Sequence, residues 1–150
     1  MKRLCKSVNR HYLLVEQLRD LGYNLAKRSF GFRVIWKRIS EEEFCVVHVD
    51  SELENLKIEE GESNIVRATA PVFCHFARLP PKGGVPQTKM SYYMKTDLKG
   101  NIPRKVVEAR ALSFFMWLLR LKAKYDRSAD IDLNVRNSVI AELAAGEEVS

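Results

Sequence analysis

Residues 83–107 read GGVPQTKMSYYMKTDLKGNIPRKVV and decide the fold. From Gln87 to Leu98 the side chains alternate in character. Thr88, Met90, Tyr92, Met94 and Thr96 share one face of a strand, and Lys89, Ser91, Tyr93, Lys95 and Asp97 share the other. This alternation is typical of a sheet with one covered and one solvated face. Asn101 is a candidate helix cap, and Pro103 is tolerated in a first helical turn.

A long helix is predicted from Pro103 to Lys124. Its apolar stripe has the spacing of one helix face and consists of Val107, Ala111, Phe114, Leu118, Leu121 and Tyr125. Four further residues widen the stripe: Leu112, Phe115, Met116 and Leu119. We therefore expect this helix to be broadly covered or to lie over a large apolar surface.

The residues before this stretch are expected to form one helix and several strands. Apolar spacing predicts a helix at 8–27, and period-two runs predict two antiparallel strands at 32–39 and 44–49. A β-prone run covers 64–79, with a break expected at Pro71, and Pro80–Pro86 is expected to be an irregular loop. Strands followed by a long helix indicate an α+β domain.

Charge is strongly segmented along the 150 residues, whose net charge is +6. Residues 1–40 and 65–127 are basic, whereas 41–64 and 128–150 are acidic, and 50–63 is expected to be an exposed loop. The basic blocks favour contact with phosphates, either of a nucleic acid or of an anionic membrane, unless the acidic segment offsets them. No apolar run is long enough for a membrane-spanning helix, and three widely spaced cysteines predict reduced thiols and a cytoplasmic protein.

The cysteine and histidine residues are weak candidates for metal binding or catalysis. In their predicted strands, Cys45 and His48 point to opposite faces, as do Cys74 and His75, which gathers metal ligands poorly. No phosphate-binding loop or nucleophile elbow is present in the sequence. We therefore expect no catalytic residue, no metal and no cofactor.

The stretch Val85–Val107 resembles the end of START domains, the steroidogenic-acute-regulatory-protein-related lipid transfer family. The matching features are a Thr-Lys-led strand, an Asp-Leu-x-Gly turn and an Ile-Pro-Arg helix opening. Residues 30–39 resemble the family's Trp-Arg-Arg strand, 44–52 its valine-rich strand and 64–68 its Val-Arg-Ala strand. The resemblance implies a START-like region at 30–126, after an N-terminal helix at 1–29. Residues 127–150 would then be a tail, partly disordered or with a short helix at Ser138–Ala145.

The resemblance also implies a helix-grip fold, in which a curved antiparallel sheet packs on the C-terminal helix, and a non-enzymatic role in binding or transferring a lipid or sterol. The expected lipid-binding residues are Trp36, Met90, Tyr92, Met94, Ala111, Phe114, Phe115 and Leu118. Expected partners are the lipid, an anionic membrane at the periphery, and a second copy that completes the sheet. Two alternatives stay open: these stripes are a filled core, or the chain is a basic nucleic-acid-binding or interaction domain without a lipid cavity.

Overall fold

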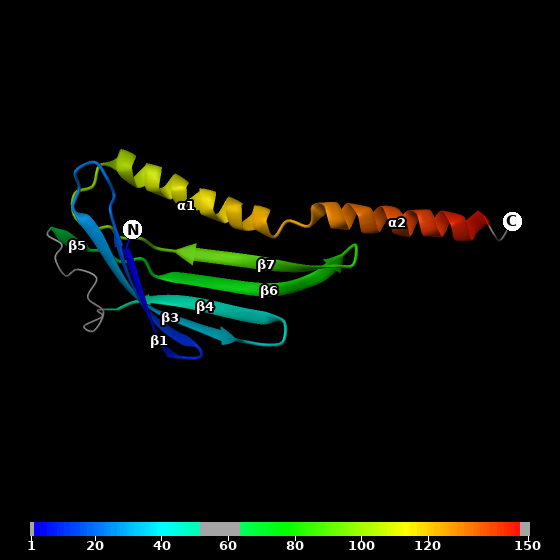
Figure 1. The fold of residues 1–150 in the computed structure, drawn as a ribbon, viewed down its shortest axis with the longest axis horizontal. Helices are drawn as coiled ribbons and strands as arrows, with labels where there is room; N and C mark the ends of the chain where they lie inside the picture. The colour runs from blue at the N-terminus through cyan, green and yellow to red at the C-terminus, as the bar shows by residue number, and fades with distance from the viewer. Residues whose placement is uncertain (1, 52–63, 148–150) are drawn as a thin grey trace. The chain divides into compact units, whose positions relative to one another are not determined.

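The structure is a computed structural model that describes residues 2–51 and 64–147. Seven strands come first and two helices follow (Figure 1). The strands are β1 (Lys2–Asn9), β2 (Tyr12–Arg19), β3 (Lys27–Arg38), β4 (Glu43–Asp50), β5 (Ile65–Arg67), β6 (Val72–Lys82) and β7 (Val85–Met94). The helices are α1 (Arg104–Lys124) and α2 (Ser128–Glu147). The predicted acidic loop lies, from residue 52 to 63, outside the described residues, and Asp50 ends β4.

All seven strands belong to one sheet with the order β1-β2-β3-β4-β6-β7, and β5 pairs with β3 off this path. The pairs β1–β2, β2–β3, β3–β4 and β4–β6 are antiparallel, and the short pair between β3 and β5 is parallel. The predicted hairpin formed by the strands at 32–39 and 44–49 is confirmed as β3 and β4. The α+β class, with an antiparallel sheet and a long helix after it, is confirmed.

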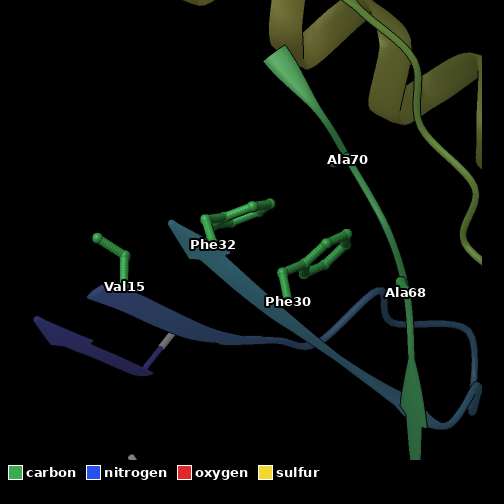
Figure 2. Packing of buried hydrophobic residues seen from close by; sticks show 5 residues of the cluster. All are labelled: Val15, Phe30, Phe32, Ala68 and Ala70. Carbon is green, nitrogen blue, oxygen red and sulfur yellow. The ribbon is translucent and has the colours of Figure 1, made fainter. Parts of the chain in front are cut away.

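The core of the sheet unit lies over β2 and β3. It consists of Val15, Phe30, Phe32, Ala68 and Ala70 (Figure 2). Leu13, Val34 and Leu98 pack against it. The predicted break at Pro71 is confirmed, because β5 ends at Arg67 and β6 begins at Val72. The segment between them brings Ala68 and Ala70 onto the core, and the backbone N–H of Ala70 donates to Asp50 Oδ1 at 2.9 Å.

The predicted N-terminal helix is wrong: residues 1–29 supply the β1–β2 hairpin and the beginning of β3. Val15 and Leu18 share a helical stripe in the sequence, yet they point to opposite faces of β2, and both are buried. A strand buried on both sides has apolar residues at consecutive positions, so its sequence also fits a helical period. The domain boundary expected at residue 30 is also wrong, because β3 runs across it from Lys27 to Arg38.

The predicted irregular loop at Pro80–Pro86 is also wrong. Pro80 and Pro81 lie in β6, and Val85 begins β7 after a two-residue turn. Gly83 and Gly84 form that turn with φ values of 53° and 74°. Tight hairpin turns need positive φ at both central residues, and glycine adopts it without steric cost. The strand predicted at 87–98 ends at Met94, and Asp97 forms an isolated bridge with Thr69.

The chain divides into two compact units. The first comprises Met1–Ala77 and Met90–Ala109, and the second comprises Arg78–Lys89 and Arg110–Ser150. The predicted helix at 103–124 is confirmed as α1, whose first turns belong to the first unit, where Val106 is buried. None of the described helices is long and apolar enough to cross a membrane.

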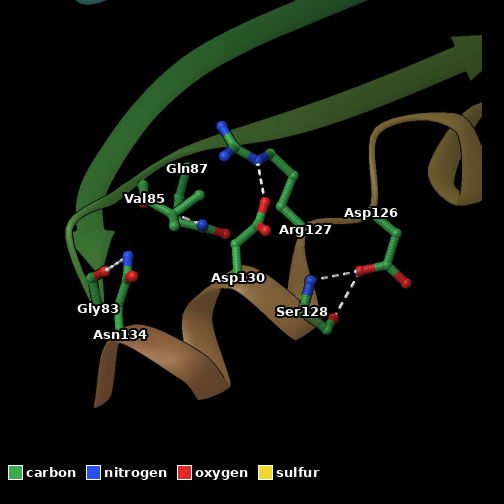
Figure 3. Close-up of polar contacts among 8 residues, drawn as sticks. All are labelled: Gly83, Val85, Gln87, Asp126, Arg127, Ser128, Asp130 and Asn134. Atoms are coloured by element: carbon green, nitrogen blue, oxygen red, sulfur yellow. Dashed lines mark hydrogen bonds and ion pairs between the residues drawn. The ribbon is translucent and has the colours of Figure 1, made fainter. Parts of the chain in front are cut away.

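In the second unit, the tail expected at 127–150 is a 20-residue helix, α2, which is longer than the short helix expected at Ser138–Ala145. Asp126 caps its beginning: its Oδ1 accepts from the Ser128 backbone N–H at 3.0 Å and from the Ser128 hydroxyl (Figure 3). Asn134 Nδ2 donates to the Gly83 carbonyl at 2.8 Å, so α2 is bound to the tip of the β6–β7 hairpin.

Candidate functional site

The strand register assigns the side chains of the sheet to two faces. Val15 lies opposite Phe32, and Phe32 lies opposite Asp50. Farther along the same strands, Trp36 lies opposite Val46, and Val46 lies opposite Cys74. Directly paired residues share a face in an antiparallel sheet, and alternate residues along a strand do so too. We call this side face A. Its apolar and aromatic members on β2, β3, β4 and β6, together with His48, are Leu13, Val15, Phe30, Phe32, Val34, Trp36, Phe44, Val46, His48, Val72, Cys74 and Phe76. The same register places Gln17, Arg19, Arg28, Arg38 and Asp50 on face A.

Strand β7 continues face A beyond β6. The Lys95 backbone N–H donates to the Pro71 carbonyl at 3.2 Å, which fixes the pairing at this end of β7. The same register explains why the rings of Phe73 and Tyr93 are 6.2 Å apart on the opposite side of the sheet, which we call face B. Alternation then places Met90, Tyr92 and Met94 on face A, with Tyr92 beside Cys74. The charge of Cys74 contributes to the pKa of Tyr92, in agreement with this placement.

Face A is mainly apolar and aromatic. Phe32 and His48 have ring centroids 5.8 Å apart, and Phe44 and Phe76 have centroids 6.0 Å apart. Phe32 is buried in the core, whereas Val46 on the neighbouring strand is only half-buried. Toward β6 and β7, face A therefore keeps apolar surface that another apolar group can still cover.

Three polar groups of face A are held in their neutral forms. Burial, with a smaller effect of the Arg3 charge, lowers the pKa of His48. Burial raises the pKa of the Cys74 thiol, and burial together with the Cys74 charge raises the pKa of Tyr92. Each shift disfavours the charged form of its group. At neutral pH this part of face A therefore presents an imidazole, a thiol and a phenol without charge.

Cationic side chains at the other end of face A already have protein partners. Arg28, which is 3% exposed, donates to the carbonyls of Leu98 at 2.7 Å, of Lys99 at 3.2 Å and of Ala26. The Arg19 guanidinium lies 5.4 Å from the Phe30 ring centroid and donates to Gln17 Oε1. Arg28 thus holds the segment that leads from β7 into α1.

The predicted lipid-binding residues fall into the two units. Trp36, Met90, Tyr92 and Met94 lie on face A of the first unit, and the Tyr92 hydroxyl donates to Met94 Sδ at 3.7 Å. Trp36, Met90 and Tyr92 are half-buried, whereas Met94 is exposed. Ala111, Phe114, Phe115 and Leu118 lie on α1 in the second unit. Ala111 and Phe115 are exposed there and Leu118 is half-buried, while the Phe114 side chain lies outside the described part of the chain.

Sequence analysis missed the contribution of β4 and β6 to this surface. Val46, His48 and Cys74 join Tyr92 on face A, although the sequence does not tell which strands are neighbours. In the sequence, the period-two alternation of residues 44–49 predicts a strand with two faces, but it does not identify the strands beside it. The predicted split of Cys45 from His48 and of Cys74 from His75 is confirmed, because Cys45 pairs with His75 on face B.

Comparison with known proteins supports the fold. No protein-family model and no curated protein sequence matches the chain. Among solved structures, human StAR-related lipid transfer protein 5 is similar, with a TM-score of 0.52 and 20% sequence identity over 88% of this chain. The chain spans only 57% of that protein's length. This likeness shows a START-like fold.

Proposed function

We propose that the protein binds or transfers an uncharged lipid or sterol, whose apolar part lies on face A. The observation that carries the proposal is the half-buried apolar surface around Val46, which is continuous with neutral Tyr92 and Cys74. Covering apolar surface is favourable by about 25 cal/mol per Å² and needs no catalytic group, so the proposed role is non-enzymatic. The START-like fold supports the same role, because its solved neighbour is a lipid transfer protein by name.

An uncharged ligand fits face A better than an ionised one. A charge taken out of water without a partner costs several kcal/mol, and the uncharged side chains of His48, Cys74 and Tyr92 offer none. A hydroxyl or carbonyl on the ligand can instead exchange a hydrogen bond with Tyr92 or His48. We therefore expect sterols and neutral glycerolipids to be preferred over fatty acids.

Further parts of the proposal concern the surroundings of face A. Ala111, Phe114, Phe115 and Leu118 of α1, in the second unit, stay predicted lipid-binding residues. We place the protein in the cytoplasm, at the periphery of membranes that supply the lipid, in keeping with its three free cysteines. Strands β1 and β7 end the strand order and are the two edges at which a second copy could extend the sheet.

Native mass spectrometry tests ligand binding directly. The full chain is incubated with vesicles that contain cholesterol, diacylglycerol and oleic acid, re-isolated, and weighed without denaturation. We expect one uncharged lipid on each chain. Wild-type protein that takes up no lipid, or takes up oleic acid alone, would overturn the proposal, and salt-sensitive binding of a single-stranded oligonucleotide in place of lipid would favour the nucleic-acid alternative.

Two adjacent valines on β4 provide matched variants. Val46 lies on face A and Val47 on face B, and both are half-buried. Val46→Lys is expected to abolish lipid uptake, whereas Val47→Lys is expected to retain it. Equal uptake by both variants would contradict the assignment to face A. If Val46→Lys fails to fold, Tyr92→Phe serves instead, and we expect about a tenfold weaker affinity for cholesterol after loss of one buried hydrogen bond.

A further inference from the structure

A row of apolar side chains crosses the opposite side of the sheet, face B. Tyr12 on β2 pairs with Ile35 on β3, Ile35 pairs with Val47 on β4, and Val47 pairs with Phe73 on β6. The Phe73 ring then contacts the Tyr93 ring on β7, with centroids 6.2 Å apart. Five neighbouring strands thus place apolar residues side by side. With a strand spacing of about 4.8 Å, this face-B row is about 19 Å long.

The face-B row is open to solvent over much of its length. Ile35 is 43% exposed, Phe73 42% and Tyr93 64%, while Tyr12 and Val47 are half-buried. Val49, which shares the face with Val47 along β4, is 46% exposed. Single exposed apolar residues are common on proteins, but a contiguous row of them marks an interaction surface.

Basic residues flank the face-B row. Arg33 and Lys37 stand two residues before and two residues after Ile35 on β3, and both are exposed. Lys95 follows two residues after Tyr93 and is exposed as well. On β1, alternation places Lys2 and Lys6 on the same face.

Acidic residues offset this charge only in part. On the described strands of the first unit, Glu16 and Glu43 share face B. Glu16 is buried next to Arg67, at 3.6 Å, and Glu43 lies 3.7 Å from His75. Beyond the end of β7, exposed Asp97 follows Lys95 by two residues and is paired with Lys99 at 2.7 Å. Among the strand residues that the structure describes, the exposed charges beside the face-B row are therefore mainly positive.

We propose that face B docks the protein on an anionic bilayer surface. Tyrosine and aliphatic side chains enter the interface between headgroups and acyl chains, and each Lys or Arg near an anionic membrane contributes about 1 kcal/mol. A second copy fits this surface poorly, since an isologous contact would bring the Arg33 and Lys37 charges of the two chains close together. The inference goes beyond the proposed ligand site, because docking uses face B and lipid uptake uses face A.

Vesicle flotation with the full chain tests the docking surface. The vesicles are phosphatidylcholine alone or phosphatidylcholine with about 30% phosphatidylserine, which sets a negative surface potential. We expect wild type to float only with the anionic vesicles. Absence of wild-type flotation, or equal flotation with both vesicle types, would overturn the proposal.

Two pairs of variants separate the apolar and the charged contributions. Phe73→Ser/Tyr93→Ser is expected to reduce partitioning about tenfold, whereas Tyr125→Ser, which removes another exposed aromatic ring, leaves it unchanged. Lys37→Glu/Lys95→Glu is expected to reduce it at least about thirtyfold, because two lost charges contribute about 1 kcal/mol each, whereas Lys122→Glu/Lys124→Glu on α1 does not. Equal loss in a variant and its control would overturn the assignment to face B.

Two further measurements separate this inference from its alternatives. Native mass spectrometry of Phe73→Ser/Tyr93→Ser is expected to show unchanged lipid uptake, so failure of docking and failure of the ligand site give different results. Light scattering is expected to give the same mass for this variant and for wild type. A wild-type dimer that becomes a monomer in the variant would assign the row to a second copy and overturn the membrane proposal.

Discussion

Replacing Arg67 by methionine is expected to destabilise the sheet unit more than any exposed substitution on the same strands. Arg67 ends β5, and its guanidinium donates to the Ser51 carbonyl at 2.6 Å and to the Ser29 hydroxyl at 3.3 Å. It also lies 3.6 Å from Glu16 Oε1. One side chain thereby connects β2, β3, β5 and the residue after β4.

The expected loss follows from the burial of the groups that Arg67 contacts. Ser29 is fully buried and the Glu16 side chain is 4% exposed, whereas the Arg67 side chain is 36% exposed. Removing one partner of a buried ion pair costs about 3–5 kcal/mol, and partial exposure of Arg67 puts this case near the lower limit. We therefore expect Arg67→Met to lower the free energy of unfolding by about 3 kcal/mol.

Urea denaturation followed by tryptophan fluorescence measures this effect in the sheet unit. The chain has two tryptophans, and a Trp117→Phe background leaves Trp36 on β3 as the reporter. Arg33→Met is the matched control, because Arg33 is exposed and donates to the hydroxyl of the same Ser51 at 2.9 Å. We expect this control to lose less than about 1 kcal/mol.

The Glu16–Arg67 ion pair itself can be tested by a double-mutant cycle. Glu16→Gln combined with Arg67→Met should cost less than the sum of the two single substitutions, with a coupling of about 1–2 kcal/mol. If Arg67→Met is as stable as Arg33→Met, or if the cycle is additive, the buried pair does not hold β5 in the way described.

Three more outcomes follow from particular residues. Gly31→Ala should destabilise by about 3 kcal/mol in the same urea assay, because the added Cβ would lie 2.0 Å from Arg67 Nη2 and 2.5 Å from the Ser51 carbonyl oxygen, and a near-wild-type value would contradict this close packing. The lowered pKa of His48 means that folding favours its neutral form, so wild-type stability should fall as the pH drops below about 6.5. His48→Gln should reduce that fall, measured as thermal melting against pH, and an unchanged profile would count against it. Iodoacetamide followed by peptide mass spectrometry should label exposed Cys5 first and Cys74 last, since Cys74 is buried with a raised thiol pKa; early labelling of Cys74 would argue against its place on face A.

The strands and helix with clear periodicity could be predicted from the sequence. Alternation from Phe32 to Lys37 gives β3 its two faces, and the pairings Phe32–Val15 and Trp36–Val46 confirm them. The stripe after Pro103 gives α1 to its final residue, Lys124. In both cases the periodicity of one element is enough for the prediction, so the neighbouring strands need not be known.

The N-terminal hairpin could not be separated from a helix by pattern alone. Val15 is buried on face A and Leu18 on face B, so β2 has buried apolar residues on both of its faces. The tip of the β6–β7 hairpin was missed for a different reason. Pro80 and Pro81 outweighed the Gly83-Gly84 turn in the prediction, although proline is tolerated in strands where its missing N–H is not needed.

The candidate site was predictable in part. The alternation of side chains along 87–98 predicts that Met90, Tyr92 and Met94 share one face, and all three lie on β7 in the structure. Adjacency of Cys74 to Tyr92, and of Val46 to Cys74, depends on strand order and register, which a single sequence does not encode locally. The contribution of Ala111, Phe114, Phe115 and Leu118 stays a prediction.

Photo-crosslinking with a diazirine-bearing sterol tests the central claim most directly, because mass spectrometry of the digested protein locates the ligand on one side of the sheet. We expect adducts on Val46, Cys74 or Tyr92, suppressed by an excess of unlabelled sterol and absent from Val46→Lys. Competed adducts confined to Ile35, Phe73 or Tyr93, or the absence of any competed adduct, would contradict a ligand site on face A.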